Sequence, residues 1–262
     1  MINNISISAK NGIRSNSYVH YLLILIVCGF AFFVNNDVIP ADLMESRNLA
    51  TTQEMVREGN YLVPTMNGEL RLEKPPLPTW VAAGVEHVLP SNLIAQRSVA
   101  GLIATMMVIF LFLLIKEITN EPILSFVSGL VLATSFNIIL MGRTATWDIY
   151  CHSFMLGAIY FLSLALKHDG AQWHCFILAG LFMGFSFLSK GPVSFFTLLL
   201  PFFIGYGITY RPRLKGKIAP LAAMILLCLI ISFWWTLYLL VTHPDMMLSV
   251  ANKESSSWLN HN

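Results

Sequence analysis

The chain has 262 residues, of which 56% are hydrophobic and only 11% are charged, and its formal net charge is +2. A soluble domain carries about 25% charged residues, so this composition excludes an ordinary soluble domain and indicates a membrane protein. The near-neutral charge also argues against nucleic acid as a partner.

Seven apolar runs are long enough, or nearly so, to cross a bilayer core, which takes about 20 apolar residues per helix. In chain order they are Tyr18–Val34, Ala95–Ile115, Pro122–Met141, Ile149–Leu166, Cys175–Ser189, Pro192–Tyr210 and Ile218–Val241. The first lacks a small-residue cleavage site, so we interpret it as an uncleaved helix. The sequence therefore predicts an all-α polytopic membrane protein with about seven transmembrane helices.

Basic residues in the short flanks predict the orientation. Lys10 and Arg14 precede the first run, and Lys116, Lys167 and the basic cluster at 211–217 fall on the same side if every run spans. That side is expected to be cytoplasmic, with the N-terminus. The segment 35–94 then becomes a first loop outside the membrane.

This first outside loop holds eight of the fourteen acids of the chain and is far longer than a connection needs. Asp42 followed by Glu45 has the pattern of a capping box, in which Asp42 is the N-cap and Glu45 reaches back to its amide. A helix is therefore expected over 43–58, with Gly59 as its C-terminal stop. We expect it to lie along the membrane surface.

The stretch after this helix combines a turn signal with three prolines. Asn67-Gly68 indicates a turn, and Pro75, Pro76 and Pro78 fix the backbone that follows. A second surface helix is expected from about Pro78 to Val88. The prolines should hold Glu73 and Lys74 at a fixed depth near the membrane face.

Further polar groups fall on the same side of the predicted topology. Asp148 lies at the mouth of the fourth run, where an aspartate costs about 2.5–3.5 kcal/mol on insertion scales, so it is expected to face a water-filled cavity. Lys190 interrupts an apolar stretch before Gly191-Pro192, and Glu254 lies in the tail after the last run. Acids and bases thus gather at one membrane face, whereas a secondary transporter would show them near the midplane.

Two other patterns concern packing. Trp80, Trp147, Trp234 and Trp235 fit an aromatic belt at the membrane interface, and no substrate contact is predicted for them. The pair Gly180–Gly184 is a helix-packing signal.

The ordered motifs of the first loop resemble those of a known family. They are Glu45-Ser46-Arg47, Gln53-Glu54-Met55, Gly59-Asn60-Tyr61-Leu62-Val63-Pro64, Asn67-Gly68 and Glu73-Lys74-Pro75-Pro76, followed by Asp148 and Ser189-Lys190-Gly191. The chain resembles the dolichyl-phosphate-mannose/protein mannosyltransferase superfamily of GT-C glycosyltransferases. Within it, the pattern is most similar to the bacterial lipid A aminoarabinose transferase group. The resemblance begins near residue 37, and Met44 stands where the family has an acid.

The resemblance implies an inverting glycosyltransferase of the bacterial cytoplasmic membrane. Its donor would be a polyprenyl-phosphate-linked sugar, its acceptor a lipid A, a protein or another glycan, and its active face outside, in the periplasm. Asp148, Glu45 and Asp42 are candidate catalytic carboxylates, Lys74, Lys190 and Arg47 candidate phosphate ligands, and Glu73 and Glu254 candidate positioning residues. Either Asp42 or Glu45 could replace the acid absent at Met44. No cofactor is specified, and a divalent cation remains open.

On this interpretation residues 1–262 form the N-terminal membrane domain, residues 35–94 carry the catalytic motifs, and a C-terminal outside domain is absent. Two other functions are compatible with the pattern. A transporter or flippase of lipid-linked sugars would line a path through the membrane with charges. A non-catalytic scaffold would keep the fold without the chemistry, which Met44 and the short chain allow.

Overall fold

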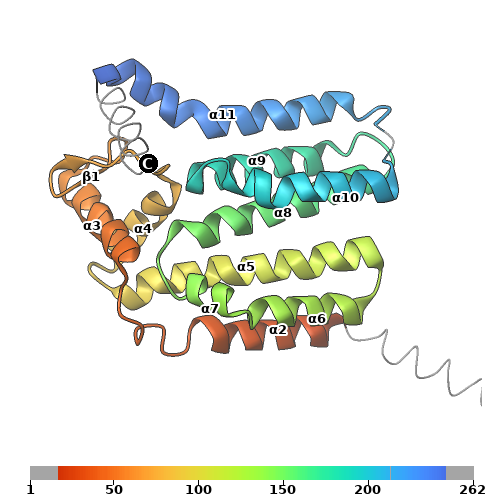
Figure 1. Cartoon of the computed structure of the whole chain (residues 1–262), viewed down its shortest axis with the longest axis horizontal. Helices are drawn as coiled ribbons and strands as arrows, with labels where there is room; N and C mark the ends of the chain where they lie inside the picture. The colour runs from red at the N-terminus through yellow and green to blue at the C-terminus, as the bar shows by residue number, and fades with distance from the viewer. Residues whose placement is uncertain (1–16, 213, 246–262) are drawn as a thin grey trace, which may run out of the picture.

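The computed structural model describes residues 17–212 and 214–245, which are almost entirely helical (Figure 1). The helices are α2 (Ser17–Phe32), α3 (Leu43–Glu58), α4 (Leu77–Val88), α5 (Leu93–Thr119), α6 (Pro122–Ala133), α7 (Phe136–Gly142), α8 (Trp147–Lys167), α9 (Trp173–Lys190), α10 (Leu200–Tyr210) and α11 (Ile218–Thr242). A π-helical segment η1 (Phe195–Leu199) leads into α10, and β1 (Thr65–Met66) pairs with β2 (Glu69–Leu70) in an antiparallel hairpin.

The long helices run side by side and form a bundle (Figure 1). Within the described residues, α5, α8, α9 and α11 are each long and apolar enough to cross a membrane, and the bent pair of α6 and α7 makes a fifth candidate. Helix α2 and the segment from η1 through α10 are apolar but shorter. The predicted all-α polytopic membrane fold is confirmed.

The third and sixth apolar runs are not single regular α-helices. The sixth consists of the π-helical segment η1 followed by α10. The third run is divided into α6 and α7, which meet at an angle of 65°. The break falls at Thr134 and Ser135, where the Thr134 hydroxyl bonds back to the Leu130 carbonyl and Ser135 is extended. Such local side-chain bonds compete with the helix ladder and bend helices.

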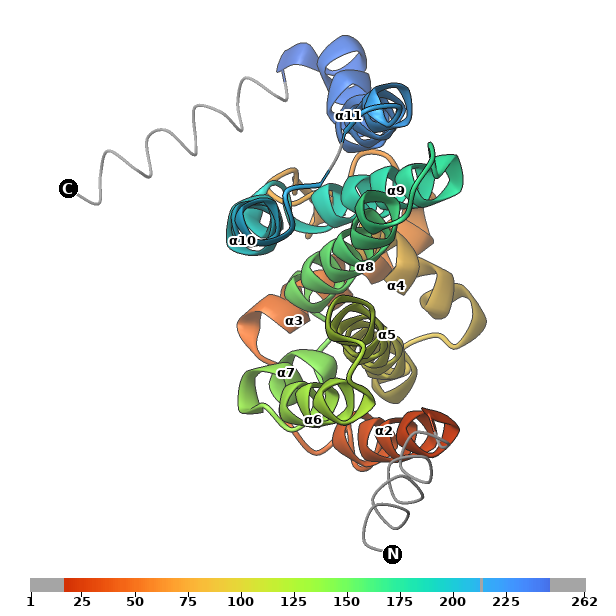
Figure 2. The same ribbon diagram turned by 90° about the vertical axis from the view of Figure 1, so that its right-hand side faces the viewer.

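Helix α8 is the centre of the hydrophobic core and lies between α5 and α9 (Figure 2). Its Ile149, Met155 and Leu162 side chains are fully buried, and they join Phe112 of α5 and Phe176 of α9 in one cluster. Because α8 is held on both sides, its N-terminal turn, which carries Asp148, has a fixed position at one end of the bundle.

The first loop, residues 35–94, folds over that same end of the bundle (Figure 1). Helix α3 begins after Asp42, whose carboxylate accepts a hydrogen bond from the Glu45 amide at 2.7 Å, and it ends at Gly59 in the left-handed region. The hairpin turn has positive φ at both Asn67 and Gly68, which is the geometry of a type I′ turn. The predicted helices and the turn of this loop are confirmed.

Candidate active site

A cavity of about 230 Å³ opens beside the N-terminus of α8, at the end of the bundle covered by the first loop. It is lined by Asp42, Met44, Lys74, Leu140, Met141, Thr144, Thr146, Trp147, Asp148 and Lys190. Its four charged residues come from four separate segments. These are the loop before α3, the proline-rich segment 73–78 before α4 (the proline strap), the first turn of α8 and the last turn of α9. All four were candidates from the sequence. A few convergent polar groups in a concave site are the usual sign of a binding site.

Asp148 and Lys190 form an ion pair across the cavity, with the Lys190 Nζ donating to Asp148 Oδ1. Their side chains keep 30% and 26% of their surface exposed. An acid in the first turn of one helix and a base in the last turn of another also suit the two helix dipoles. The pair is open to a ligand, and Lys190 can turn from the carboxylate to another anion.

Lys74 is the cation of the cavity that has no counter-ion among the residues the structure describes. Its side chain is half-buried, and none of the ion pairs found in residues 17–212 and 214–245 includes it. Pro75 and Pro76 follow it and hold its backbone. A partly buried ammonium without a carboxylate partner favours an anionic ligand.

Glu45 does not reach this cavity, because it is fully buried in an ion pair with Arg97 of α5. Arg97 Nε and Nη2 donate to the two carboxylate oxygens at 2.8 and 2.7 Å, and the Ala145 amide donates to Oε1 at 2.9 Å. The predicted reciprocal half of the capping box, from Glu45 to the Asp42 amide, is therefore wrong. A buried arginine supplies a stronger partner than a helix amide does.

The Glu45 cluster fixes the loop that presents Asp148. The Asn48 side-chain amide donates to the Ala145 carbonyl at 2.8 Å. Ala145 is therefore held through both its backbone amide and its backbone carbonyl. Arg97 also donates to the carbonyls of Asn36 and Ile39. Four segments thus meet at the Glu45–Arg97 pair, and the sequence prediction did not include Arg97. An arginine within an apolar helix was the available signal.

Arg47 and Glu73 line a different cavity, also of about 230 Å³, together with Glu69 and Arg71. Arg71 is buried, its guanidinium donates to the Thr51 hydroxyl and to the Met66 sulfur, both at 3.2 Å, and the Glu73 carboxylate of the same cavity attracts it. The structure does not bring Arg47 to the cavity of Lys74 and Lys190.

Trp147 separates the two cavities. It lines the first, and the Arg71 guanidinium packs over its ring at 5.3 Å from the centroid. Trp147 and Trp235 are each only 4% exposed, so the predicted aromatic belt is wrong for these two residues. Both rings are packed inside the protein.

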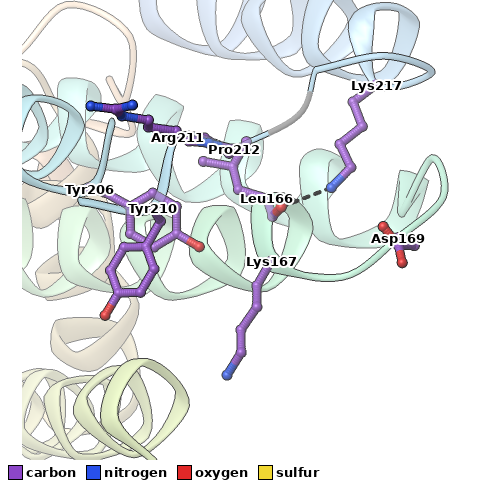
Figure 3. Close-up of a pocket in the computed structure, with 8 residues that line it drawn as sticks. All are labelled: Leu166, Lys167, Asp169, Tyr206, Tyr210, Arg211, Pro212 and Lys217. Atoms are coloured by element: carbon purple, nitrogen blue, oxygen red, sulfur yellow. Dashed lines mark hydrogen bonds between the residues drawn. The ribbon is translucent and has the colours of Figure 1, made fainter. Parts of the chain in front are cut away.

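At the opposite end of the bundle lies a cavity of about 300 Å³, lined by residues of α8, α10 and the segments that follow them (Figure 3). Its Lys217 points to Leu166 and donates to the carbonyls of Ala165, Leu166 and His168 at the C-terminus of α8. A cation there satisfies helix carbonyls that have no intrahelical donor. We interpret this contact as a helix cap.

Glu254 lies outside the described residues. Within residues 17–212 and 214–245, no group of three or more His, Cys, Asp or Glu side chains could hold a metal ion.

An apolar helical bundle with a charged cavity at one end defines this chain as a polytopic membrane protein. Residues 73–235 match the family described as dolichyl-phosphate-mannose-protein mannosyltransferase, and the chain belongs to this family.

Proteins similar to the chain are found among both curated sequences and solved structures. An uncharacterised protein from Aquifex aeolicus strain VF5 is 28% identical over 244 residues, which cover 90% of this chain and 46% of that protein. The undecaprenyl phosphate-alpha-4-amino-4-deoxy-L-arabinose arabinosyl transferase 2 of Pseudomonas fluorescens strain Pf0-1 is 28% identical over 207 residues, or 77% of this chain and 37% of that protein. The chain thus spans less than half the length of these relatives.

The fold is similar to the crystal structure of ArnT from Cupriavidus metallidurans. In the structure bound to undecaprenyl phosphate, the TM-score is 0.71 at 18% identity, and the match covers 88% of this chain and 43% of that one. In the apo structure the TM-score is 0.70, and the match covers 91% and 43%.

Proposed function

We propose that this chain forms the N-terminal membrane part of a glycosyltransferase that uses a polyprenyl-phosphate-linked sugar as donor. The observation that carries the proposal is the convergence of Asp42, Lys74, Asp148 and Lys190 in one cavity at the loop end of an apolar bundle. A lipid-linked donor places its phosphate and sugar at the membrane face, where this cavity opens. The Pseudomonas relative, named as an undecaprenyl phosphate-alpha-4-amino-4-deoxy-L-arabinose arabinosyl transferase, and the ArnT structure bound to undecaprenyl phosphate support this donor class.

The reaction breaks the bond between sugar C1 and a phosphate oxygen, and negative charge develops on the leaving phosphate. Fixed cations stabilise this charge most strongly in the transition state. We assign Lys74 and Lys190 to this role, because Lys74 has no counter-ion within the described part of the chain and Lys190 can leave Asp148. Displacement by the acceptor on the opposite side of C1 gives inversion.

Asp148 and Asp42 are the carboxylates of the cavity, and we assign them to the acceptor. A carboxylate within reach of an acceptor hydroxyl removes its proton as a general base. If the acceptor is already an anion, such as a lipid phosphate, the carboxylates position groups instead. Glu45, with both oxygens bonded inside the protein, supports the site and does not act as a base.

The acceptor belongs to the lipid A, protein or glycan class. The proposed location is the bacterial cytoplasmic membrane, with the cavity at its outer, periplasmic face. The basic side chains at the opposite end, including Lys116, Lys167 and Lys217, support this orientation, because basic flanks favour the cytoplasmic side.

Substitution of Asp148 and Lys74 in the full-length protein tests this function. We expect Asp148→Asn and Lys74→Ala each to lower sugar transfer by about 100-fold or more, the range seen when a general base or a charge-stabilising group is removed. Lipid mass spectrometry of the cells should show the polyprenyl-phosphate sugar accumulating while one glycan loses that sugar.

The matched controls are Asp169→Asn and Lys167→Ala, which change the same residue types at the other end of the bundle. They should keep transfer near the unsubstituted level, and all four variants should reach the membrane in similar amounts. Normal transfer in the Asp148→Asn and Lys74→Ala variants would contradict the proposed site.

A further inference from the structure

Trp147 differs in its hydrogen bonding from the buried Trp235 and from the partly buried Trp80. Trp80 Nε1 donates to the Tyr61 carbonyl at 2.7 Å, and Trp235 Nε1 donates to the Leu62 carbonyl at 2.8 Å. Trp147 Nε1 is as deeply enclosed, yet it has no hydrogen-bond partner among the described residues. The indole of tryptophan is a donor only, and a buried indole N–H normally finds an acceptor.

Trp147 lies among charged side chains of both signs, Asp42 and Asp148 with Lys74 and Lys190, and has a further cation on its ring face. It lines the same cavity as Lys74, Asp148 and Lys190, and Arg71 places a buried guanidinium over its ring at 5.3 Å. A cation on the face of an aromatic ring is attracted to its π electrons and draws them toward itself. The indole N–H beneath it becomes a stronger donor, and a charged acceptor gains most from such a donor.

We propose that Trp147 is a substrate-binding residue whose indole N–H donates a hydrogen bond to an anionic phosphate oxygen of the lipid ligand in this cavity. Arg71 is its positioning residue, because it holds and polarises the ring without lining the cavity itself. Since Nε1 is enclosed, the phosphate reaches it only as the lining side chains move, and Lys190 leaves Asp148 for the anion at the same time. This inference rests on the proposed lipid-phosphate donor.

The test is Trp147→Phe in the chain reconstituted into lipid nanodiscs, with undecaprenyl phosphate and uncharged undecaprenol as probes. Phenylalanine keeps an aromatic ring under Arg71 and removes the N–H together with part of the bicyclic indole. We expect binding of undecaprenyl phosphate to weaken about 10- to 100-fold, as for the loss of a hydrogen bond to a charged group. Binding of undecaprenol should not change. The melting temperature should fall less than in the Trp235→Phe control, because buried ring volume is lost but no hydrogen bond within the protein is.

Trp235→Phe is the matched control, since Trp235 is equally buried but donates to a backbone carbonyl. It should lower the melting temperature and keep the affinity for undecaprenyl phosphate. In the unsubstituted chain labelled with 15N at tryptophan, the indole resonance that Trp147→Phe removes should shift downfield when undecaprenyl phosphate is added.

Two outcomes would overturn the proposal in distinguishable ways. If the chain prefers the phosphate and Trp147→Phe binds it equally well, with no shift of the indole resonance, Trp147 does not contact the phosphate. If the unsubstituted chain shows no preference for undecaprenyl phosphate over undecaprenol, the proposed donor class itself fails.

Discussion

Two ion pairs of this chain show how burial decides what a charge can do. Asp148 and Lys190 remain about one-third exposed, so their attraction is screened and either partner can exchange it for a ligand. Glu45 and Arg97 are completely buried, and their carboxylate and guanidinium are bonded on several sides. Breaking the first pair therefore changes chemistry at the cavity, and breaking the second changes the fold around it.

Glu45→Ala should destabilise the protein strongly. It leaves the Arg97 guanidinium buried without its counter-ion, and removing one partner of a buried pair costs about 3–5 kcal/mol. Thermal unfolding in detergent measures the effect. Glu58→Gln breaks the exposed Arg57–Glu58 pair, with side chains 74% and 44% exposed, and should change stability by less than about 1 kcal/mol. Equal stability of the two variants would contradict the structural role of Glu45.

The sequence identified the four charged residues of the cavity, because charged residues are conspicuous between apolar runs. Their convergence could not be predicted, since it depends on how α3, α8 and α9 pack. The sequence also could not separate Asp42 from Glu45 as the carboxylate of the first loop. That distinction follows from Arg97, which lies 52 residues further along the chain than Glu45.

At the scale of elements, the hairpin is organised by one carboxylate. Glu54 of α3 accepts hydrogen bonds from the Thr65 hydroxyl at 2.8 Å and from the Asn67 and Gly68 amides at 2.6 and 2.8 Å. It therefore ties the type I′ turn to the helix that precedes it. The hairpin in turn leads into the proline strap that holds Lys74.

This contact makes part of the stability dependent on pH. The hydrogen bond from Thr65, together with those from the turn amides, lowers the pKa of Glu54 below its ordinary 4.5. A carboxyl group with a lowered folded-state pKa contributes stability above its unfolded value and loses it as pH falls through the folded value.

Glu54→Gln should therefore lower the melting temperature near pH 7, and the difference from the unsubstituted chain should shrink below about pH 4.5. Melting curves between about pH 7 and pH 3 measure this. Glu58→Gln, which removes a carboxylate paired with Arg57 on the same helix, is the control. A deficit for Glu54→Gln that stayed constant down to the lowest pH would rule out the charge of Glu54 as its cause.

Local signals predicted the elements of the first loop well, because a cap, a glycine stop and an Asn-Gly turn each act within a few residues. Local signals did not predict features that depend on the packing of segments far apart in the sequence. The close packing of α7 against Phe32 of α2 depends on Gly142, since a Cβ there would lie 2.7 Å from the Phe32 ring. No nearby residue carries that information.

At the scale of the whole molecule, the position of Lys190 depends on how closely α9 packs against its neighbours. The pair Gly180–Gly184 faces α11, and the helix-packing contact predicted for this pair is confirmed. A Cβ at Gly180 would lie 2.6 Å from the Met224 carbonyl oxygen, and one at Gly184 would lie 2.6 Å from the Ile231 Cβ. The two helices can approach this closely only because both positions lack a side chain.

Gly180→Ala should force α9 and α11 apart and destabilise the bundle by about 1–3 kcal/mol, the usual effect of overpacking. The clash is with backbone, so no rotamer change relieves it. Gly205→Ala in α10 is the control, because a Cβ there meets nothing within 4 Å. It should leave the melting temperature equal or slightly higher, since alanine favours a helix by up to about 1 kcal/mol over glycine.

Because α9 ends at Lys190, the same substitution should also weaken binding of undecaprenyl phosphate, and Gly205→Ala should not. Binding and melting temperature measured on the same preparations would show both effects together. A Gly180→Ala variant with unchanged stability would mean that α9 and α11 are packed more loosely than the distance to Met224 indicates. The link between bundle packing and the cavity would then have to run through α8 alone.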